Sequence, residues 1–498
     1  MDQLSLIGPE LILTVFALLV LTVDLLSDEK GRAWSPWLAL FALVLALVDS
    51  IALFGVPAQT VFGRMYAADV FTSFFRIITL VMGGLIVLAS KQYIEKRTKF
   101  VAEFYALLLF VLMSIFMMAA SVDLLMLFLA FEFLSITSYI MVGFLRDDKK
   151  SSEAAIKYFL YGSVSSAIML YGISLLYGVA GDTSLTAIAK AFADTKTMAQ
   201  FQGLVALAIT LTIVGFGYKI ALAPFHQWSP DAYEGAPTPV TAFISLGPKI
   251  AGFAALARVM LVALPNFAPD WTNVLWAIAA LSMTLGNLVA LRQRNIKRLL
   301  AYSSIAQTGY MLIGIVATNV STGGVLDSAG LGLRSILFYL VAYIFTNMGI
   351  FLAVIAYSNA IGSDDIGDYA GMIKRSPLMA LAMLVFFLSL AGIPPTAGFI
   401  GKFLVFGAAL DAANRMASNM LITLAIIGAI NSAISVGYYF NIVRYMFFMP
   451  ARDDTPVVIA PSLSWPLWFS TAATLVLGLV PQPLITFADL SIRAIFKG

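Results

Sequence analysis

The sequence predicts an all-α membrane protein with about fourteen transmembrane helices. Of its 498 residues, 61% are hydrophobic and only 11% are charged, and the mean hydropathy is +0.93. Soluble domains usually carry about a quarter charged residues. The apolar runs are about 20 residues long, which is enough to cross a bilayer as helices. No run shows the alternating pattern of a membrane β-barrel, so helices are the expected elements.

The expected spans follow one another through short connections. The first follows MDQLSLIGPE, which is acidic rather than basic, so we interpret it as a retained helix and not a cleaved signal. The longest outer connection, GDTSLTAIAKAFADTKTMAQF, has helical spacing typical of a segment at the membrane interface. The spans are expected at residues 8–26, 34–54, 69–90, 102–119, 122–145, 153–178, 203–226, 238–262, 271–291, 299–317, 331–358, 378–404, 420–446 and 463–486.

Lysine and arginine residues collect in alternate connections. Because cytoplasmic loops carry an excess of these residues, the richer set should face the cytoplasm and both termini the opposite, periplasmic side. The richer set contains Lys30, Arg32, Lys91, Lys96, Arg97, Lys99, Arg146, Lys149, Lys150, Arg292, Arg294, Lys297, Arg298, Lys374, Arg375 and Arg452. The other set contains Arg64, Lys190, Lys196, Arg415, Arg493 and Lys497.

The composition argues against several kinds of chemistry. With no cysteine, the chain cannot use disulfides, thiolate metal ligands, iron–sulfur clusters or cysteine nucleophiles. A single histidine, His226, argues against a self-contained haem or zinc site. The net charge of +3 does not indicate nucleic-acid binding, and no soluble domain or Gly-rich phosphate loop interrupts the spans. Any chemistry is therefore expected inside the membrane.

Several ionisable residues lie within apolar segments, where an unpaired charge is costly. The arginines among them stay charged and are favoured as fixed structural pairs or snorkelling anchors. The others are four lysines and one glutamate, so most of these lysines cannot be neutralised by pairing within this chain. The set is Arg76, Glu132, Lys157, Lys219, Lys249, Arg258, Arg334 and Lys402.

Glu132, in LFLAFEFLSITSYI, and Lys249, in ISLGPKIAGFAAL, lie near the middle of their spans. Burial disfavours a charged lysine and a nearby carboxylate favours it, so such a pair can hold a proton and release it when a neighbouring charge moves. The alternative is a static buried salt bridge that only fixes helix packing. The surplus of lysines over glutamate favours proton storage.

Two spans have prolines and glycines next to a buried lysine. Pro224 follows Lys219, and Gly215 and Gly217 precede it, which predicts missing helical hydrogen bonds beside the charge. The twelfth span, LSLAGIPPTAGFIGKFLVF, has two prolines before Lys402. Both spans contain the pattern G-F-x-x-K-apolar, and they are five spans apart, an odd offset that indicates an inverted repeat.

Lys157 and His226 are secondary candidates. Lys157, in SSEAAIKYFLYG, lies near the cytoplasmic end of its span, where snorkelling explains it as well as proton transfer does. His226 follows Pro224, near Asp231 and Glu234. A histidine there can relay protons near neutral pH, although a polar cap at a helix end is the simpler role.

The sequence resembles the subunit N family of bacterial complex I, the proton-pumping NADH:quinone oxidoreductase, whose mitochondrial counterpart is NADH dehydrogenase subunit 2. The resemblance extends over nearly the whole chain. The runs that carry it are AFEFLSITSYIMVGF, SSEAAIKYFLYGSVSSA, GFGYKIALAPFHQWSPDAYEGAPTPV, NIKRLLAYSSIAQTGYMLIG and SLAGIPPTAGFIGKF.

The resemblance implies an antiporter-like fold with two inverted five-helix repeats and broken helices seven and twelve. The repeats would be helices 4–8, at residues 101–262, and helices 9–13, at residues 271–446. Three helices at 1–100 would precede them and one at 463–486 would follow. The M type of this family carries a glutamate where Lys402 stands, and the L type a long carboxy-terminal lateral helix, so the N type fits best.

The resemblance also implies roles for individual residues. Glu132 matches the glutamate of helix five, Lys219 its partner lysine in helix seven, Lys249 the central lysine of helix eight and Lys402 the terminal lysine of helix twelve. Lys157 and His226 also fall on family positions. Arg334 has no usual counterpart, so it either alters the polar axis near helix eleven or pairs with Asp327.

The function implied is proton translocation without redox chemistry in this chain. A change of charge beside Glu132 would weaken its pairing with Lys219 and drive a proton toward Lys249 and Lys402. NADH, FMN, iron–sulfur clusters and quinone would be held by other subunits of this translocase. The partners would be an M-type subunit and small K- and J-type subunits in a bacterial inner membrane. The alternatives are a subunit of a multisubunit Na⁺/H⁺ antiporter and a passive membrane scaffold.

Overall fold

The computed structural model describes residues 3–318, 326–451, 453, 455–493 and 495, without the side chains of 28–31, 195–199 and 326–329. Fourteen helices in these ranges are long and apolar enough to cross a membrane, which confirms the predicted all-α class. Thirteen of them overlap the expected spans closely, but the twelfth expected span, 378–404, was misplaced: it covers the shorter helix Pro377–Ala391 and the break, whereas the helix long enough to cross is Ala397–Met416. The division between the fourth and fifth spans lies at residues 121–123, where the sequence offers only a short join.

The amino-terminal part contains three spans and a small hairpin that the sequence analysis did not anticipate. Its two strands pair antiparallel, with Gln59 opposite Ala68. Asp69 caps the third span by accepting a hydrogen bond from the Thr72 backbone N–H. The elements are α1 (Gln3–Leu6), α2 (Gly8–Leu26), α3 (Asp28–Leu53), β1 (Gln59–Val61), β2 (Tyr66–Ala68) and α4 (Val70–Glu95).

The next part contains five spans and two short helices. The expected interfacial connection does form a short helix, α8, before the seventh span begins. The elements are α5 (Val101–Ala120), α6 (Leu124–Val142), α7 (Lys149–Ala180), α8 (Leu185–Ala193), α9 (Thr195–Lys219), α10 (Trp228–Gly235) and α11 (Thr238–Arg258), which continues as a π-helical turn, η1 (Val259–Ala263).

The remaining chain supplies the other six spans. The last expected span is divided, because α19 ends at Leu479 and a separate helix follows after Pro481. The elements are η2 (Pro265–Phe267), α12 (Ala268–Ala290), α13 (Ile296–Ala317), α14 (Leu326–Ile361), η3 (Ile366–Tyr369), α15 (Met372–Arg375), α16 (Pro377–Ala391), α17 (Ala397–Met416), α18 (Asn419–Phe448), α19 (Pro461–Leu479) and α20 (Gln482–Ile492).

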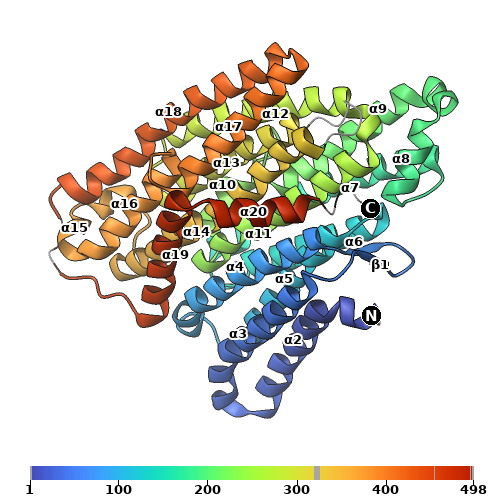
Figure 1. Cartoon of the computed structure of the whole chain (residues 1–498). Helices are drawn as coiled ribbons and strands as arrows, with labels where there is room; N and C mark the ends of the chain where they lie inside the picture. The colour runs from blue at the N-terminus through green and yellow to red at the C-terminus, as the bar shows by residue number, and fades with distance from the viewer. Residues whose placement is uncertain (1–2, 319–325, 452, 454, 494, 496–498) are drawn as a thin grey trace.

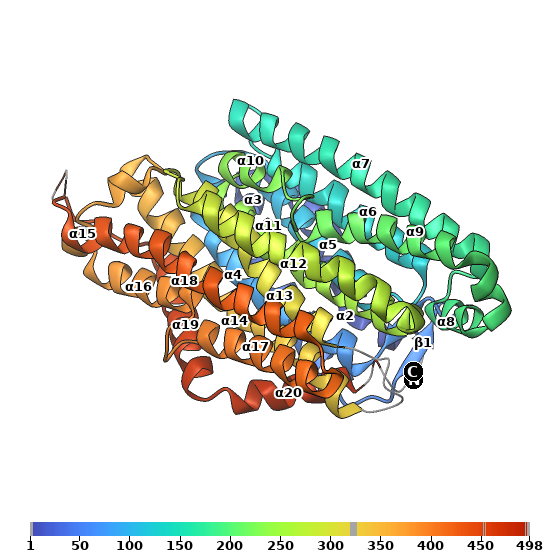
Figure 2. The same cartoon turned by 90° about the horizontal axis from the view of Figure 1, so that it is seen from above.

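Three helices form the centre of the bundle: α11, α13 and α14. Every residue of α11 is buried, and α13 and α14 are buried almost as completely. Figure 1 shows α2 and α3 at one margin of the bundle, and Figure 2 shows α7 along one edge and α20 along the opposite edge. Polar side chains in the middle of these three helices are therefore mostly surrounded by protein.

Two buried ion pairs hold the amino-terminal spans in place: one joins α2 to α4 within them, and the other joins them to α11. Arg76 donates to both carboxylate oxygens of Glu10, and Arg258 donates to both oxygens of Asp69, at 2.8 and 2.9 Å. Arg258 also donates to the Ala119 carbonyl oxygen. Arginine's planar fork suits such contacts, so these two arginines hold helices together as the sequence analysis favoured.

Candidate functional site

The first helix break follows Lys219, the last residue of α9. The chain turns through Ala221, which has a φ of 58°, and resumes as α10 at Trp228. The turn leaves carbonyl groups without helical partners. The Trp228 indole N–H takes up one of them, at 3.0 Å from the Tyr218 oxygen. The remaining backbone groups can bind side chains from other helices, which a continuous helix would prevent.

Lys219 Nζ reaches across to α6. It donates to the Phe131 carbonyl oxygen at 3.0 Å and to Ser135 Oγ at 2.5 Å. The same nitrogen lies 3.7 Å from the centre of the Phe131 ring. Because the side chain is only 2% exposed, these groups replace its contact with water.

Glu132 lies beside this site without a direct ion pair to Lys219. The two groups are near enough to interact electrostatically, and Glu132 Oε1 is buried without a hydrogen-bond partner among the described residues. The ammonium group is held instead by Phe131, the residue before Glu132 in α6, and by Ser135, about one turn after it. The geometry thus brings together the two expected partners and leaves a carboxylate oxygen open to a further contact.

Lys249 lies on α11 and contacts the same break from the other side. Its Nζ donates to the Ile220 carbonyl oxygen at 3.3 Å, and Ile220 directly follows Lys219. The lysine is 2% exposed. Lys249 therefore binds the backbone one residue after Lys219.

The second helix break separates α16 from α17. Lys402, in the second turn of α17, donates to the carbonyl oxygens of Leu390 and Ala391 at 2.9 and 3.0 Å, and to Ser432 Oγ at 2.8 Å. These three acceptors match the three N–H groups of an ammonium. The Tyr310 ring centre lies 4.6 Å from the nitrogen.

Gly392 allows this contact. Its φ of +83° ends α16, and an added Cβ would lie 2.7 Å from Lys402 Cδ. Glycine adopts this backbone conformation without steric cost and also leaves room for the lysine side chain. The Gly392 position thus determines whether Lys402 can reach the end of α16.

The two lysines lie on opposite sides of their breaks. The G-F-x-x-K pattern at Lys219 precedes its break, whereas the same pattern at Lys402 follows its break. The short motif therefore does not align the two breaks with each other. A break beside each buried lysine is the feature that the two regions share.

A neutral polar network around Lys402 was missed by the sequence analysis, which screened for charge. Gln307 Nε2 donates to the Leu390 carbonyl oxygen, the acceptor that Lys402 also uses, at 3.0 Å. Its Oε1 accepts from the Tyr339 hydroxyl. Gln307 is 1% exposed on a central helix, and a buried amide in the run SSIAQTGY is the signal that could have revealed it.

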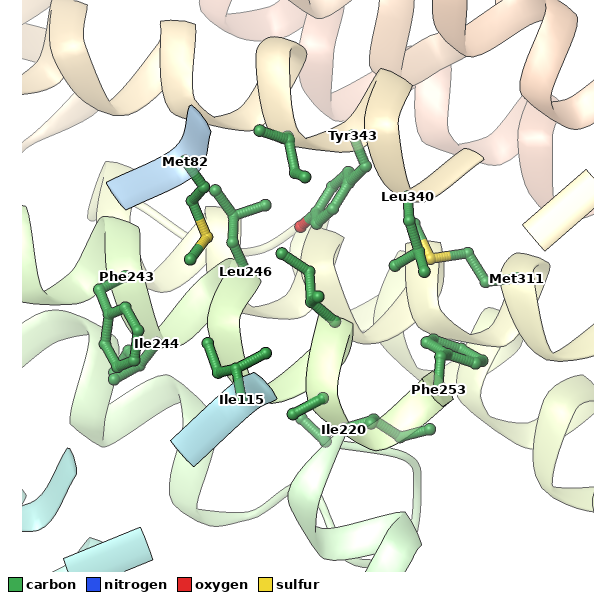
Figure 3. Packing of buried hydrophobic residues seen from close by; sticks show 14 of the residues in the cluster. Met82, Ile115, Ile220, Phe243, Ile244, Leu246, Phe253, Met311, Leu340 and Tyr343 are labelled. Atoms are coloured by element: carbon green, nitrogen blue, oxygen red, sulfur yellow. The ribbon is translucent and has the colours of Figure 1, made fainter. Parts of the chain in front are cut away.

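Buried apolar side chains pack between α11, α13 and α14, the helices that include those carrying Lys249 and Gln307. Figure 3 shows Leu246 and Phe253, one turn before and after Lys249, in one cluster with Met311 and Leu340 from α13 and α14. No hydrogen bond among the described residues connects Lys249 to Gln307. The central lysine and the terminal lysine are therefore not joined by a chain of hydrogen bonds between described side chains.

Lys157 lies in a partly exposed ion cluster. Its Nζ contacts Asp231 and Glu153 at 3.0 and 2.7 Å, and Arg298 contacts the other oxygen of Asp231. The burial of Asp231 opposes its ionisation, but the hydrogen bonds from Arg298 and Lys157 hold the pKa of its carboxyl below the usual range. Sequence analysis did not foresee this cluster, because its members come from three helices.

His226 and Arg334 lie apart from the lysines. The His226 side chain is 9% exposed, and its Nδ1 has no hydrogen-bond partner among the described residues. Arg334 contacts Asp489 of α20 at 3.3 Å. Its expected partner Asp327 lies outside the described side chains. Within the described ranges, no three His, Asp or Glu side chains gather as a metal site.

Comparisons with known proteins agree with this arrangement. The family model "NADH:quinone oxidoreductase/Mrp antiporter, TM" matches residues 121–435, which include both breaks. NADH-quinone oxidoreductase subunit N of Trichlorobacter lovleyi is 43% identical, over 99% of this chain and 98% of that protein.

Two solved structures have a similar fold. A chain of respiratory complex I from Thermus thermophilus with bound aureothin is 31% identical, with a TM-score of 0.78 over 97% of this chain and 99% of that chain. A chain of the Mrp complex from Dietzia sp. is 23% identical, with a TM-score of 0.81 over 99% and 98% of the two chains. The second likeness concerns the fold alone.

Proposed function

The chain belongs to the NADH:quinone oxidoreductase/Mrp antiporter family, and we propose from this premise that it translocates protons as a membrane-arm subunit of an NADH:quinone oxidoreductase. One observation carries the proposal. Three buried lysines, Lys219, Lys249 and Lys402, are each bound to backbone carbonyl groups at a helix break. A lysine can gain and lose a proton there, whereas an arginine would stay charged.

The first half of the path responds to charge. A positive charge that approaches Glu132 would bind its open carboxylate oxygen and weaken the attraction between Glu132 and Lys219. Lys219 would then release its proton more readily. Lys249, which binds the carbonyl oxygen of the residue after Lys219, would be the next group to take up the proton, and a water molecule between the two ammonium groups would have to carry it.

The second half of the path has no continuous chain of described hydrogen bonds. A bridge of water between Lys249 and Gln307 would complete it, so that a proton could pass on to Lys402. Gln307 would receive such a water chain, since it shares the Leu390 carbonyl oxygen with Lys402. Lys157 and His226 remain secondary candidates, because no described hydrogen bond joins their side chains to these lysines.

The chemistry of electron transfer would lie elsewhere in the complex. We propose that NADH, FMN, iron–sulfur clusters and quinone bind to other subunits of this translocase and that this chain holds no redox centre. Its direct partners would be the M-type subunit and the small K- and J-type subunits. The cytoplasm would face the basic-rich side, with both termini on the other side.

A Na⁺/H⁺ antiporter subunit is the second candidate function, and the likeness to the Dietzia Mrp chain favours it at the level of fold. The two candidate functions differ in the subunits with which the chain assembles. Co-purification with flavin-containing subunits supports the oxidoreductase. Isolation only with other antiporter subunits would support the alternative.

The main experiment compares Lys219→Met and Glu132→Gln with Lys374→Met, which removes an exposed lysine. The rate of NADH-driven proton uptake or release by vesicles is divided by the rate of NADH oxidation to give the proton-to-electron ratio. Assembly of the complex is measured in the same membranes. We expect a lower proton-to-electron ratio in the first two variants and an unchanged ratio in the third. Assembled Lys219→Met and Glu132→Gln complexes that pump at the normal ratio would show that the chain is a passive scaffold.

A further inference from the structure

A groove on the lipid-facing side of α5, α6 and α7 has a volume of about 550 Å³ and takes no part in the proposed proton path. Its floor is apolar, and its walls include Ile136 and Ile140 of α6 and Ile156 and Phe159 of α7, each about half exposed. The groove lies between membrane-spanning helices, so its natural occupant is also apolar.

Two charged groups stand at one end of this groove: Glu103, in the first turn of α5, and Arg146, in the connection after α6. They make no ion pair with each other or with another described side chain. Glu103 Oε2 is buried without a hydrogen-bond partner among the described residues. A buried acceptor of this kind needs a donor, and none of the described residues supplies one.

We propose that this groove binds one phospholipid with a primary-amine headgroup, phosphatidylethanolamine. An acyl chain lies against Ile140 and Phe159, the phosphate binds Arg146, and the ammonium group donates to Glu103. The guanidinium matches a phosphate because it offers two parallel N–H donors.

The charges at the mouth select this headgroup. With a purely anionic headgroup, Arg146 would neutralise the phosphate, and the Glu103 carboxylate would be left without a positive partner. A choline headgroup carries a positive charge but no N–H group, so it cannot satisfy the Glu103 oxygen. Ethanolamine supplies both the charge and the donor. The charged mouth of the groove lies at the basic-rich end of the helices, where lipid headgroups are expected.

The test uses the assembled complex, stripped of loosely bound lipid and incubated with equimolar isotope-labelled ethanolamine, choline and glycerol phospholipids. Retained lipid is measured by mass spectrometry. The Ile140→Trp side chain fills the groove. The amount of lipid that the unaltered complex retains beyond the Ile140→Trp complex is therefore the lipid bound at this site. Ile430→Trp, at an equally exposed position on α18, is the matched control.

Two charge variants test the headgroup assignment. Arg146→Gln should weaken retention of all three lipids about tenfold through loss of one charge-assisted contact, whereas Arg292→Gln, at another exposed arginine, should not. Glu103→Gln should abolish the preference for ethanolamine over choline. Equal retention in the Ile140→Trp and unaltered complexes, or no preference for ethanolamine, would overturn the proposal.

A protein helix from a neighbouring subunit is the competing occupant. The chain has no cysteine, so Ile140→Cys provides a unique thiol in it. Cross-linking of that thiol to a neighbouring subunit in high yield would also overturn the proposal. Protection of the thiol by added ethanolamine phospholipid supports it.

Discussion

Lys219 and Lys402 lie at two helix breaks that differ in the groups around the ammonium. Near Lys219 there is a carboxylate, Glu132, and the nitrogen has two hydrogen-bond acceptors. Lys402 has three acceptors, all uncharged, and no acidic side chain pairs with it among the described residues. The first site can therefore respond to an approaching charge, and the second can hold a proton without one.

The backbone conformations of the breaks differ in a similar way. Each break contains one residue with positive φ, Ala221 in the first and Gly392 in the second. Alanine pays a steric cost in this conformation and glycine does not. The first break therefore carries a backbone strain that its surrounding contacts must offset, whereas the second break does not.

The largest effect is expected for Lys402→Met. It removes three hydrogen bonds at once, each worth about 1.5–3 kcal/mol when the donor is charged, although Gln307 still donates to the Leu390 carbonyl oxygen and Ser432 to that of Ala391. We expect the proton-to-electron ratio to fall and the thermal stability of the complex to decrease. Lys219→Met should lower the ratio with a smaller loss of stability, since two acceptors are affected. Equal stability losses would contradict the proposed difference between the breaks.

An intermediate effect is expected for Gly392→Ala. The left-handed conformation costs an alanine about 1–2 kcal/mol, and the new Cβ would also displace Lys402. Thermal unfolding and the proton-to-electron ratio should both show the change. Gly407→Ala on α17 is the control, because no atom lies within 4 Å of its added Cβ. That helical substitution should preserve or increase stability.

The smallest effect is expected for Asp231→Asn, beyond the first break. The lowered pKa of Asp231 means that its ion pairs stabilise the fold above about pH 4 and lose this contribution as the pH falls further. The cluster is partly exposed, so its contribution should be below about 1 kcal/mol. Unfolding measured between pH 3 and 7 should show a weaker pH dependence in the variant, while the second break is unaffected. A larger acid dependence in the variant would contradict this assignment.

The sequence was sufficient for the number of spans and for the place of both breaks, but not for the bounds of the twelfth and last spans. Apolar run length determined the number of helices, and Pro224 and Pro394 marked the points where helical hydrogen bonds must fail. It was not sufficient for the contacts of Lys219. Whether its nitrogen meets the Glu132 carboxylate or the Phe131 carbonyl depends on how α6 is rotated, and a uniformly apolar helix carries no periodic signal of that rotation.

The sequence analysis also misjudged the burial of one loop lysine and passed over one buried neutral side chain. Lys297 was counted with the loop charges, yet it is 6% exposed and contacts Asp364 at 3.3 Å. Gln307 carries no charge and was passed over, although it binds the same carbonyl group as Lys402. Both residues depend on helices that are distant in sequence and meet only in the folded bundle.

The ion pair between Asp69 and Arg258 also bears on the order of biosynthesis. Its members are 189 residues apart in the chain. At about 5–20 residues per second, a ribosome needs roughly ten to forty seconds to make that interval. Asp69 must wait in the translocation machinery, or near the membrane surface, until Arg258 has been inserted. The contact between the amino-terminal helices and α11 can therefore be completed only after α11 has been made, so Asp69 is without this arginine partner during the whole interval.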